Sequence, residues 1–290
     1  MSEDFSAQVA AAAGRLSPQE RTVAEFLLDR PHDAVTASTA EIAAATGTSD
    51  ATVVRTARKL GYSGLRELKR ALMAKVTNPR DPAAVLEHRL ARADTGLGPV
   101  LDQMLTDATT LLAQLPEELD ETSWRRAVDL LDTAQTIWVY GIGPAGLIAE
   151  YHVLELSRIR RRAHAITQTG LRLADPLLGI GAADVVVIYA PLRHFHEIDV
   201  AVAQARRVGA SVVLVTQTLG PEMQDRVDVV LNVPQAAATT VSENFVDILL
   251  AHALTFELAK RDRVSAVAAR QALTQLRTEI VAGTTLDTDE

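Results

Sequence analysis

Hydrophobic and polar residues follow two different patterns along the chain. Up to about residue 115 the apolar positions recur every three or four residues, which is the spacing of a buried helix face. After Trp124 the pattern changes to short apolar runs separated by helical stretches. Strands are predicted over 136–140, 162–167, 184–189, 211–216 and 228–233. Because apolar strands that alternate with helices form parallel sheets covered on both faces, we expect an all-α region followed by an α/β region.

Capping signals delimit the N-terminal helices. Ser-Pro-Gln-Glu at 17–20 and Ser-Thr-Ala-Glu at 38–41 are capping boxes, in which the serine and the glutamate satisfy each other's backbone N–H groups. Gly47 is expected to end the second helix, because glycine tolerates a positive φ. Ser49 caps a third helix over 50–60. Two short helices joined by a glycine turn form a helix-turn-helix.

The third helix has the features of a DNA-recognition helix. Its spacing places Val53, Ala57 and Leu60 inward and leaves its N-terminal end and its basic residues on other faces. The residues expected to reach base edges are Ser49, Asp50, Ala51, Thr52 and Arg55. The residues expected to neutralise phosphates are Arg58, Lys59, Arg66, Lys69 and Arg70. The alternative is a solvated basic face on a small helical bundle.

Charge is distributed unevenly, and this favours the DNA interpretation. The chain of 290 residues holds 29 Lys and Arg against 37 Asp and Glu, a formal net charge of −8. Residues 51–80, however, carry eight Lys and Arg against Glu67 alone, which gives +7. We therefore expect contact with double-stranded DNA through one basic segment. The absence of cysteine excludes disulfides, thiolate metal sites and a cysteine nucleophile.

A glycine-rich turn follows the first predicted strand. Gly141 to Gly146 match G-x-G-x-x-G, so a dinucleotide site is one interpretation. That fingerprint also needs an acid near the end of the second strand, where this chain has His164, Thr167 and Gln168. We therefore favour no cofactor. His152, in the helix after this turn, is interpreted as a structural residue.

Breaks in the pattern predict the domain boundaries. Asn-Pro-Arg-Asp-Pro at 78–82 marks one boundary, and Pro116 is expected to end the connecting helices. Two further helices are predicted near 242–260 and 264–281. The expected organisation is a helix-turn-helix domain at 1–77, a helical linker at 78–124, an α/β domain at 125–260 and a C-terminal helix with an acidic tail at 261–290.

Both halves of the chain resemble one known family. The segments LSPQERTVAEFLLDRP and STAEIAAATGTSDATVVRTARKLGYSGLRELKRAL resemble the RpiR-type bacterial transcription regulators. The later WVYGIGPAGLIAE, RAHAIT and ADVVVIYAP resemble the sugar isomerase (SIS) domain of that family. The resemblance implies a three-layer α/β SIS domain with a flavodoxin-like parallel sheet. It also implies a homodimer or homotetramer that senses a phosphosugar. A symmetric dimer would in turn prefer an inverted repeat in DNA.

The expected ligand site departs from the family pattern. Ala145 stands where the family usually has serine, and residues 189–197 (YAPLRHFHE) replace the usual Ser-x-Ser-Gly-x-Thr loop. The candidate ligand-binding residues are Gly141, Gly143, Ala145, Arg193, His194 and His196. The three basic residues could replace the missing hydroxyls as cationic donors to a small anionic effector. The alternative is a domain that only dimerises. A metal at His194 and His196 is disfavoured, because no third ligand lies nearby in the sequence.

Three functions follow from these patterns. The favoured one is a cytoplasmic, non-enzymatic transcription regulator that has no catalytic residues and no membrane segment, since no apolar run is long enough to span a bilayer. The second is an SIS-type sugar-phosphate isomerase or lyase, for which Glu243 and His252 could form an acid–base pair. The third is a dimeric DNA-binding protein without an effector.

Overall fold

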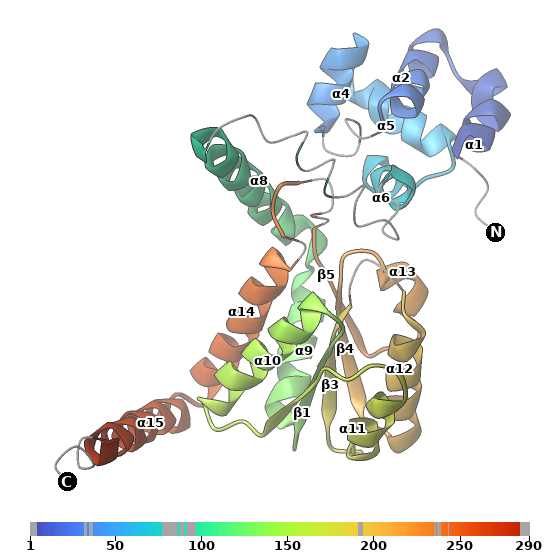
Figure 1. The fold of residues 1–290 in the computed structure, drawn as a ribbon. Helices are drawn as coiled ribbons and strands as arrows, with labels where there is room; N and C mark the ends of the chain where they lie inside the picture. Colours follow the sequence, from blue (N-terminus) through green and yellow to red (C-terminus); the bar gives the residue numbers. More distant parts are fainter. Residues whose placement is uncertain are drawn as a thin grey trace. The chain divides into compact units, whose positions relative to one another are not determined.

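The computed structural model describes residues 5–31, 34, 37–76, 86, 90, 97–190, 194–234, 236, 239–242 and 244–284. The chain divides into two compact units. The first comprises residues 1–108 and 236–242, and the second comprises residues 109–235 and 243–290. Figure 1 shows helices in the first unit and a sheet with its covering helices in the second.

The first unit is helical, as predicted. Its elements are α1 (Phe5–Ala12), η1 (Ala13–Arg15), α2 (Pro18–Asp29), α4 (Thr39–Thr46), α5 (Asp50–Lys59) and α6 (Leu65–Val76). Both capping boxes form. Gly47 ends α4 with φ 63°, in the left-handed region where glycine has no steric penalty. Val23, Ile42, Val53 and Leu68 are fully buried and hold α2, α4, α5 and α6 together.

One predicted helix end, at Pro116, is wrong. Helix α8 (Leu97–Glu118) continues past Pro116, which lies inside it. A proline breaks a helix because it lacks an N–H and clashes with the preceding turn. Pro116 removes one N–H donor from α8, and the helix nevertheless continues to Glu118.

The second unit contains a five-stranded parallel sheet, which confirms the five predicted strands and their flavodoxin-like arrangement. The strand order is β2-β1-β3-β4-β5, and all neighbours are parallel. The strands are β1 (Ile137–Gly141), β2 (Ala163–Ile166), β3 (Val185–Ala190), β4 (Ser211–Thr216) and β5 (Val229–Asn232). In this register Tyr140 of β1 pairs with Ile188 of β3.

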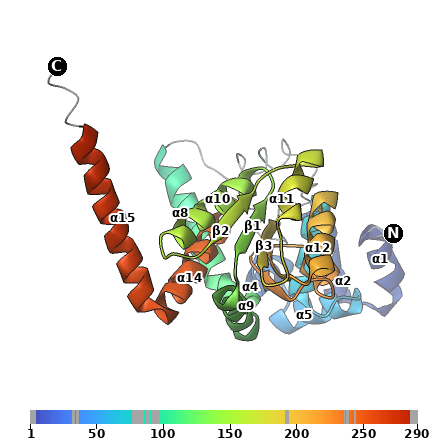
Figure 2. The ribbon, with the colours of Figure 1, turned by 90° about the horizontal axis from the view of Figure 1, so that it is seen from below.

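Helices cover both faces of the sheet and complete the three layers (Figures 1 and 2). One face carries α9 (Glu121–Thr133), α10 (Pro144–Ser157) and α14 (Phe245–Arg261). The other carries η2 (Gly170–Leu173), α11 (Ala174–Leu178), α12 (His196–Val208) and α13 (Gly220–Met223). The last helix, α15 (Arg263–Thr284), follows α14 and projects from this unit. Among the described residues, no helix has the length and hydropathy needed to cross a membrane.

Candidate functional site

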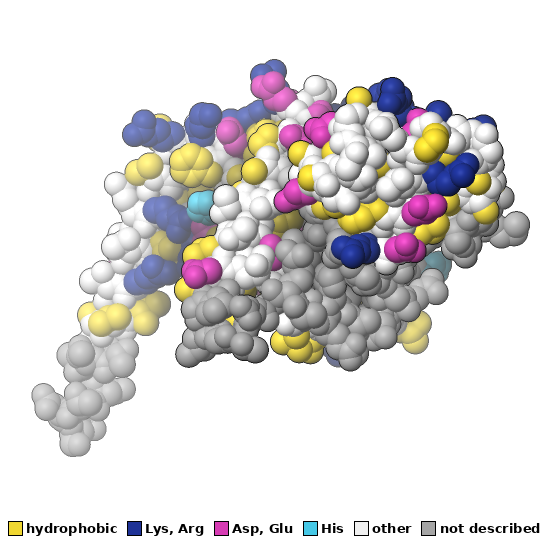
Figure 3. Space-filling view, turned by 90° about the horizontal axis from the view of Figure 1, so that it is seen from above, with side chains coloured by type: hydrophobic (Ala, Val, Ile, Leu, Met, Phe, Trp, Pro, Cys, Tyr) yellow, Lys and Arg dark blue, Asp and Glu magenta, His cyan; other side chains and the backbone are white. Residues whose placement is uncertain are grey.

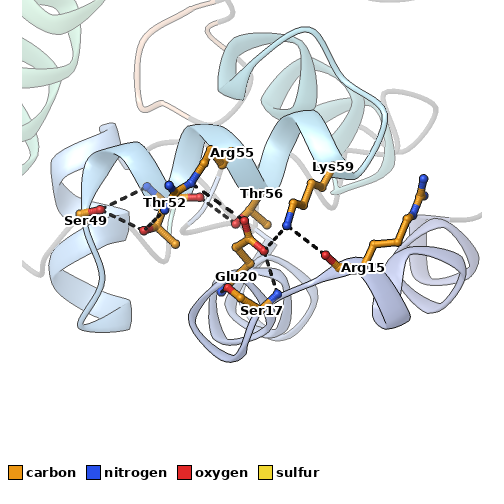
Figure 4. A network of polar contacts seen from close by, with 8 residues as sticks. All are labelled: Arg15, Ser17, Glu20, Ser49, Thr52, Arg55, Thr56 and Lys59. Atoms are coloured by element: carbon orange, nitrogen blue, oxygen red, sulfur yellow. Dashed lines mark hydrogen bonds and ion pairs between the residues drawn. The ribbon is translucent and has the colours of Figure 1, made fainter.

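Ser49 and Thr52 shape the N-terminal end of α5 (Figure 4). Ser49 Oγ accepts a hydrogen bond from the Thr52 N–H at 3.3 Å and lies 2.9 Å from Thr52 Oγ1. Arg55 Nη2 donates to the same Oγ1 at 3.2 Å. Thr52 is only 1% exposed, so its predicted place on a solvent-facing side of the helix is wrong. Its hydroxyl instead holds the cap and the Arg55 side chain in place.

Lys59 ties α5 to α2 through a buried carboxylate. Lys59 Nζ lies 2.7 Å from Glu20 Oε2, and the Glu20 side chain is 4% exposed. The same ammonium donates to the Arg15 carbonyl at 3.0 Å, and the Ser17 N–H donates to Glu20 at 2.8 Å. The Lys59 hydrogen bond, followed by that of the Ser17 N–H, lowers the pKa of Glu20. The Lys59 ammonium thus binds two oxygen atoms of its own unit. Lys59 was predicted to contact phosphate, but these bonds give it a structural role.

The other basic candidates fall into different environments. Lys69 donates to the Ala37 carbonyl, and burial lowers its pKa. Arg58 is exposed and donates through Nε to the Ser63 carbonyl at 3.4 Å. Arg66 is exposed on α6, and the Arg70 side chain lies outside the described residues. On α5 and its cap the exposed candidates are Ser49, Asp50, Ala51, Arg55, Arg58 and Lys59, of which Lys59 already binds Glu20.

In the second unit, the glycine turn between β1 and α10 is explained by close packing. A Cβ on Gly141 would lie 2.2 Å from the Ala145 carbonyl oxygen, and Ala145 itself is 3% exposed. Gly143 has φ 59° and ψ −128°, a conformation that only glycine adopts readily. A Cβ on Gly146 would lie 3.3 Å from Thr167 Cγ2. The glycines thus bring α10 close to the carboxyl ends of the strands, and this packing requires no dinucleotide.

His194 lies between two carboxylates. Its Nε2 is 3.0 Å from Asp199 Oδ2, and its Nδ1 is 3.4 Å from Glu222 Oε2. Arg226 also pairs with Asp199, at 2.5 Å. Burial opposes ionisation of Asp199, but the hydrogen bonds from Arg226 and His194 outweigh it and lower the pKa of that carboxyl. Both ring nitrogens of His194 therefore face acids, which argues against its predicted role as a donor to an anion.

The two other predicted basic donors are His196 and Arg193. The side chain of His196 is 87% exposed, and its Nδ1 lies 3.9 Å from Asp199 Oδ2. Arg193 lies outside the described residues. The described part of the chain thus places His194 and His196 beside the same Asp199 carboxylate.

Sequence reasoning missed buried polar groups on both faces of the sheet, with His152 and Tyr189 on one face and Tyr140 on the other. His152 is fully buried on α10, with Nδ1 2.9 Å from Tyr189 Oη. Its Nε2 and the buried Tyr140 Oη have no hydrogen-bond partner within the described parts of the chain. Burial lowers the pKa of His152 to about 3 and raises that of Asp247 to about 7. The tyrosines stand in apolar runs, where only their hydroxyls signal polarity.

Comparison with known proteins identifies both units. The model described as "Helix-turn-helix domain, rpiR family" matches residues 4–79, and the SIS domain model matches residues 130–259. Together the two models match more than half of the chain. The chain belongs to the RpiR family, with an SIS domain after its helix-turn-helix. This agrees with the resemblance seen in the sequence.

Similar proteins include two that bear regulator names. The HTH-type transcriptional regulator YbbH of Bacillus subtilis is 27% identical over 203 residues, which cover 70% of each chain. YfhH of Escherichia coli K12, named likewise, is 28% identical over 218 residues, 73% of this chain and 74% of that protein. The "Bifunctional protein glk" of Paraburkholderia xenovorans is 28% identical over 71% of this chain, but the match spans only 32% of that protein.

Solved structures share the fold of this RpiR-family chain. The sugar isomerase domain of the RpiR transcription factor from Sphaerobacter thermophilus has a TM-score of 0.56 at 19% identity, over 60% of this chain and 98% of that one. The NanR protein of Vibrio vulnificus, complexed with ManNAc-6P, has a TM-score of 0.56 at 20% identity, over 94% of this chain and 98% of that one. At these identities the likeness concerns the fold alone.

Proposed function

We propose that this RpiR-family chain is a sequence-specific DNA-binding transcription regulator whose SIS domain senses a small metabolite. The observation that carries the proposal is the α4–Gly47–α5 motif, in which buried contacts fix α5 while its N-terminal end stays exposed. The regulator names of YbbH and YfhH support it. The role is that of a reader and sensor and not of an enzyme.

The exposed residues of α5 have two proposed roles in DNA binding, contact with base edges and contact with phosphates. Asp50, Ala51 and Arg55 lie where a recognition helix meets base edges, and the Arg55 side chain is 61% exposed. Arginine can donate two parallel hydrogen bonds to guanine, so Arg55 is the proposed base reader. Arg58, farther along the helix, is a proposed phosphate contact. Lys59 and Lys69 act as positioning residues through their internal bonds.

A homodimer is the proposed binding form. A two-fold axis would place two copies of α5 in successive major grooves, about 34 Å apart, so the operator would be an inverted repeat. DNase footprinting on DNA upstream of the protein's own gene tests this. We expect one protected inverted repeat at physiological salt. Equal protection of scrambled DNA would refute sequence-specific recognition.

The effector site is proposed at the carboxyl ends of the strands, around the turn from Gly141 to Ala145. Ligands bind at that edge in open parallel sheets, and the N-terminus of α10 faces it. The ManNAc-6P complex of NanR supports a sugar-phosphate derivative as the ligand class. His194 lies beside Asp199 and Glu222. We therefore propose that the backbone N–H groups of the glycine turn donate more of the hydrogen bonds to the ligand than His194 does.

Two assays test the effector and the absence of catalysis. A thermal-shift screen over sugar phosphates should raise the melting temperature for at least one compound, because a ligand that binds only the folded state stabilises it. Intact operator binding without any shift would favour the dimer that needs no effector. The alternative enzyme needs His252 and Glu243 as an acid–base pair. His252 is exposed on α14, which does not favour a catalytic pair shielded from water, and Glu243 lies outside the described residues. Turnover of aldose or ketose phosphates would overturn the non-enzymatic role.

A further inference from the structure

Helices α14 and α15 join at an elbow, and a groove lies in the angle between them. Only Asp262 stands between the two helices, which diverge from this point in Figure 2. Lining side chains recur every three or four positions on each helix: Phe256, Ala259 and Lys260 on α14, and Ala266, Val267 and Arg270 on α15. Each set therefore occupies one face of its helix. Because the two faces converge where the helices join, the groove is closed at the elbow.

The groove has the dimensions of a small-molecule site. Its volume is about 790 Å³, within the range of roughly 300–1,000 Å³ that ligand pockets span. Along α15 it extends from residue 263 to residue 274, about 16 Å at the rise of an α-helix. It includes Glu155, near the C-terminal end of α10, whereas the proposed effector edge lies at the N-terminal end of that helix, about 20 Å away. The groove is thus separate from the effector site.

The walls of the groove are apolar and exposed to solvent. Phe256 on one wall is 65% exposed, and Val267 on the other is 50% exposed. The His252 ring stacks on Phe256 with ring centroids 6.4 Å apart, and Ile159 and Ala259 extend the apolar lining. Figure 3 shows hydrophobic side chains beside Lys and Arg side chains along this arm of the molecule. A ligand with an apolar body would remove this surface from water.

Positive charge exceeds negative charge in the lining. Lys260, Arg263 and Arg270 stand against Glu155 alone. The Glu155 side chain is 9% exposed and already pairs with Arg158 at 2.5 Å and with Arg270 at 2.9 Å. The acid of the groove is therefore neutralised within the protein, and the remaining charge favours an anion.

Arg263 supplies the cation that no acid engages. Glu257 pairs with Lys260 at 3.5 Å, and Asp262 accepts the Ser265 N–H at 3.1 Å as a cap of α15. Within the part of the chain that the structure describes, no hydrogen bond or ion pair involves the exposed Arg263 side chain. It lies at the closed end of the groove. A guanidinium there can donate two parallel hydrogen bonds to a carboxylate.

We propose that the groove binds an organic carboxylate with an extended apolar body, of the chemical class of a medium-chain fatty acid. The carboxylate pairs with Arg263 at the elbow, and the apolar chain lies between Phe256 and Val267. The closed end suits a ligand with one charged terminus better than a helix that runs through the groove. This is a second ligand site, and it depends neither on DNA binding nor on the sugar-phosphate effector.

Isothermal titration calorimetry of the full chain with sodium decanoate, below its critical micelle concentration, tests the role of Arg263. We expect saturable binding of one decanoate per chain. Arg263→Gln should weaken it about 10-fold or more, because a charge-assisted pair is lost. The matched control Arg172→Gln, at an exposed arginine of η2, should leave it unchanged. 1-Decanol, which lacks the charge, should not distinguish wild type from Arg263→Gln; equal weakening of both ligands would contradict the carboxylate pair.

A second pair of variants tests the apolar wall. Val267→Glu should weaken decanoate binding at least about 100-fold, because it places a carboxylate beside the apolar chain. Val264→Glu makes the same change on the same helix, at a residue that is 84% exposed and does not line the groove. Circular dichroism should show an unchanged fold for both, since both side chains face solvent. Equal weakening by the two variants would refute the groove as the site.

Two further results decide between occupants. No saturable decanoate binding to the folded wild type would overturn the proposal. Loss of self-association in Val267→Glu, measured by sedimentation equilibrium, together with no decanoate binding to wild type, would assign the groove to a second copy instead.

Footprinting separates this site from the proposed function. Decanoate binding that depends on Val267 without any operator footprint would refute the regulator and leave the site intact. A normal footprint without decanoate binding would refute the site and leave the regulator intact.

Discussion

Replacing Lys59 by methionine separates a structural role for this residue from a DNA-binding one. The substitution keeps the aliphatic stem but leaves the Glu20 carboxylate, 4% exposed, without its ammonium partner. The Ser17 N–H would remain as a donor, at 2.8 Å. Breaking a fully buried pair costs about 3–5 kcal/mol. Because Lys59 is 41% exposed and water screens that end, we expect a loss of about 2 kcal/mol in the unfolding free energy of the helical unit.

The loss should depend on pH. The pKa of Glu20 is lowered in the folded chain, so its contribution is present above its unfolded pKa and disappears as pH falls through the folded value. Lys59→Met should therefore destabilise near neutral pH, and this effect should shrink only as pH falls below the ordinary pKa of a glutamate, about 4.3, through the lower folded value. Hydrogen exchange of the α2 and α5 amides measures this, because it reports the stability of one region of a two-unit chain.

A double-mutant cycle with Glu20→Gln isolates the pair. The double variant should lose less stability than the two single losses added together. Operator affinity measured over a range of salt gives the opposite test. If Lys59→Met leaves α2 and α5 as stable as before but reduces the salt slope by about one, Lys59 contacts a phosphate and the ion-pair explanation is wrong.

Three other substitutions test separate features. Gly47→Ala should cost about 1 kcal/mol in chemical unfolding, because φ is 63° although nothing obstructs a Cβ; no loss would show that α4 ends differently. Gly141→Ala should destabilise the second unit far more, because the Cβ would lie 2.2 Å from the Ala145 carbonyl oxygen; near-native melting of that unit would contradict this packing. Burial raises the pKa of Asp247 to about 7, so this residue should lower the stability of the fold progressively as pH rises from about 4 to 7. Asp247→Asn should therefore raise the unfolding free energy by up to about 4 kcal/mol near pH 8 and change it little near pH 4. An equal effect at both pH values would refute the raised pKa.

Elements set by local signals were predicted well from the sequence. The capping boxes at Ser17 and Ser38 and the turn at Gly47 depend on residues within a few positions, and all three form. The five strands follow from apolar runs, and their order fits the parallel α/β pattern. Pro116 was misjudged because the loss of one N–H donor does not by itself end a helix.

The candidate site was harder to predict, because its side chains find partners far along the chain. Glu20 and Lys59 are 39 positions apart, and Glu222, one of the two acids beside His194, comes from α13. Helical spacing alone placed Thr52 with the exposed face, whereas the bond to the Ser49 cap draws it inward. Side-chain burial at the end of a helix depends on such contacts and not on periodicity alone.

The central claim is that α5 reads a DNA sequence, and Arg55→Ala tests it most directly. Fluorescence anisotropy would measure the affinity of wild type and variant for the footprinted operator and for unrelated DNA at the same salt. We expect a loss of about 1–3 kcal/mol on the operator and a smaller loss on unrelated DNA, so that specificity falls. Equal losses on both DNAs, or none on either, would contradict base reading by this helix.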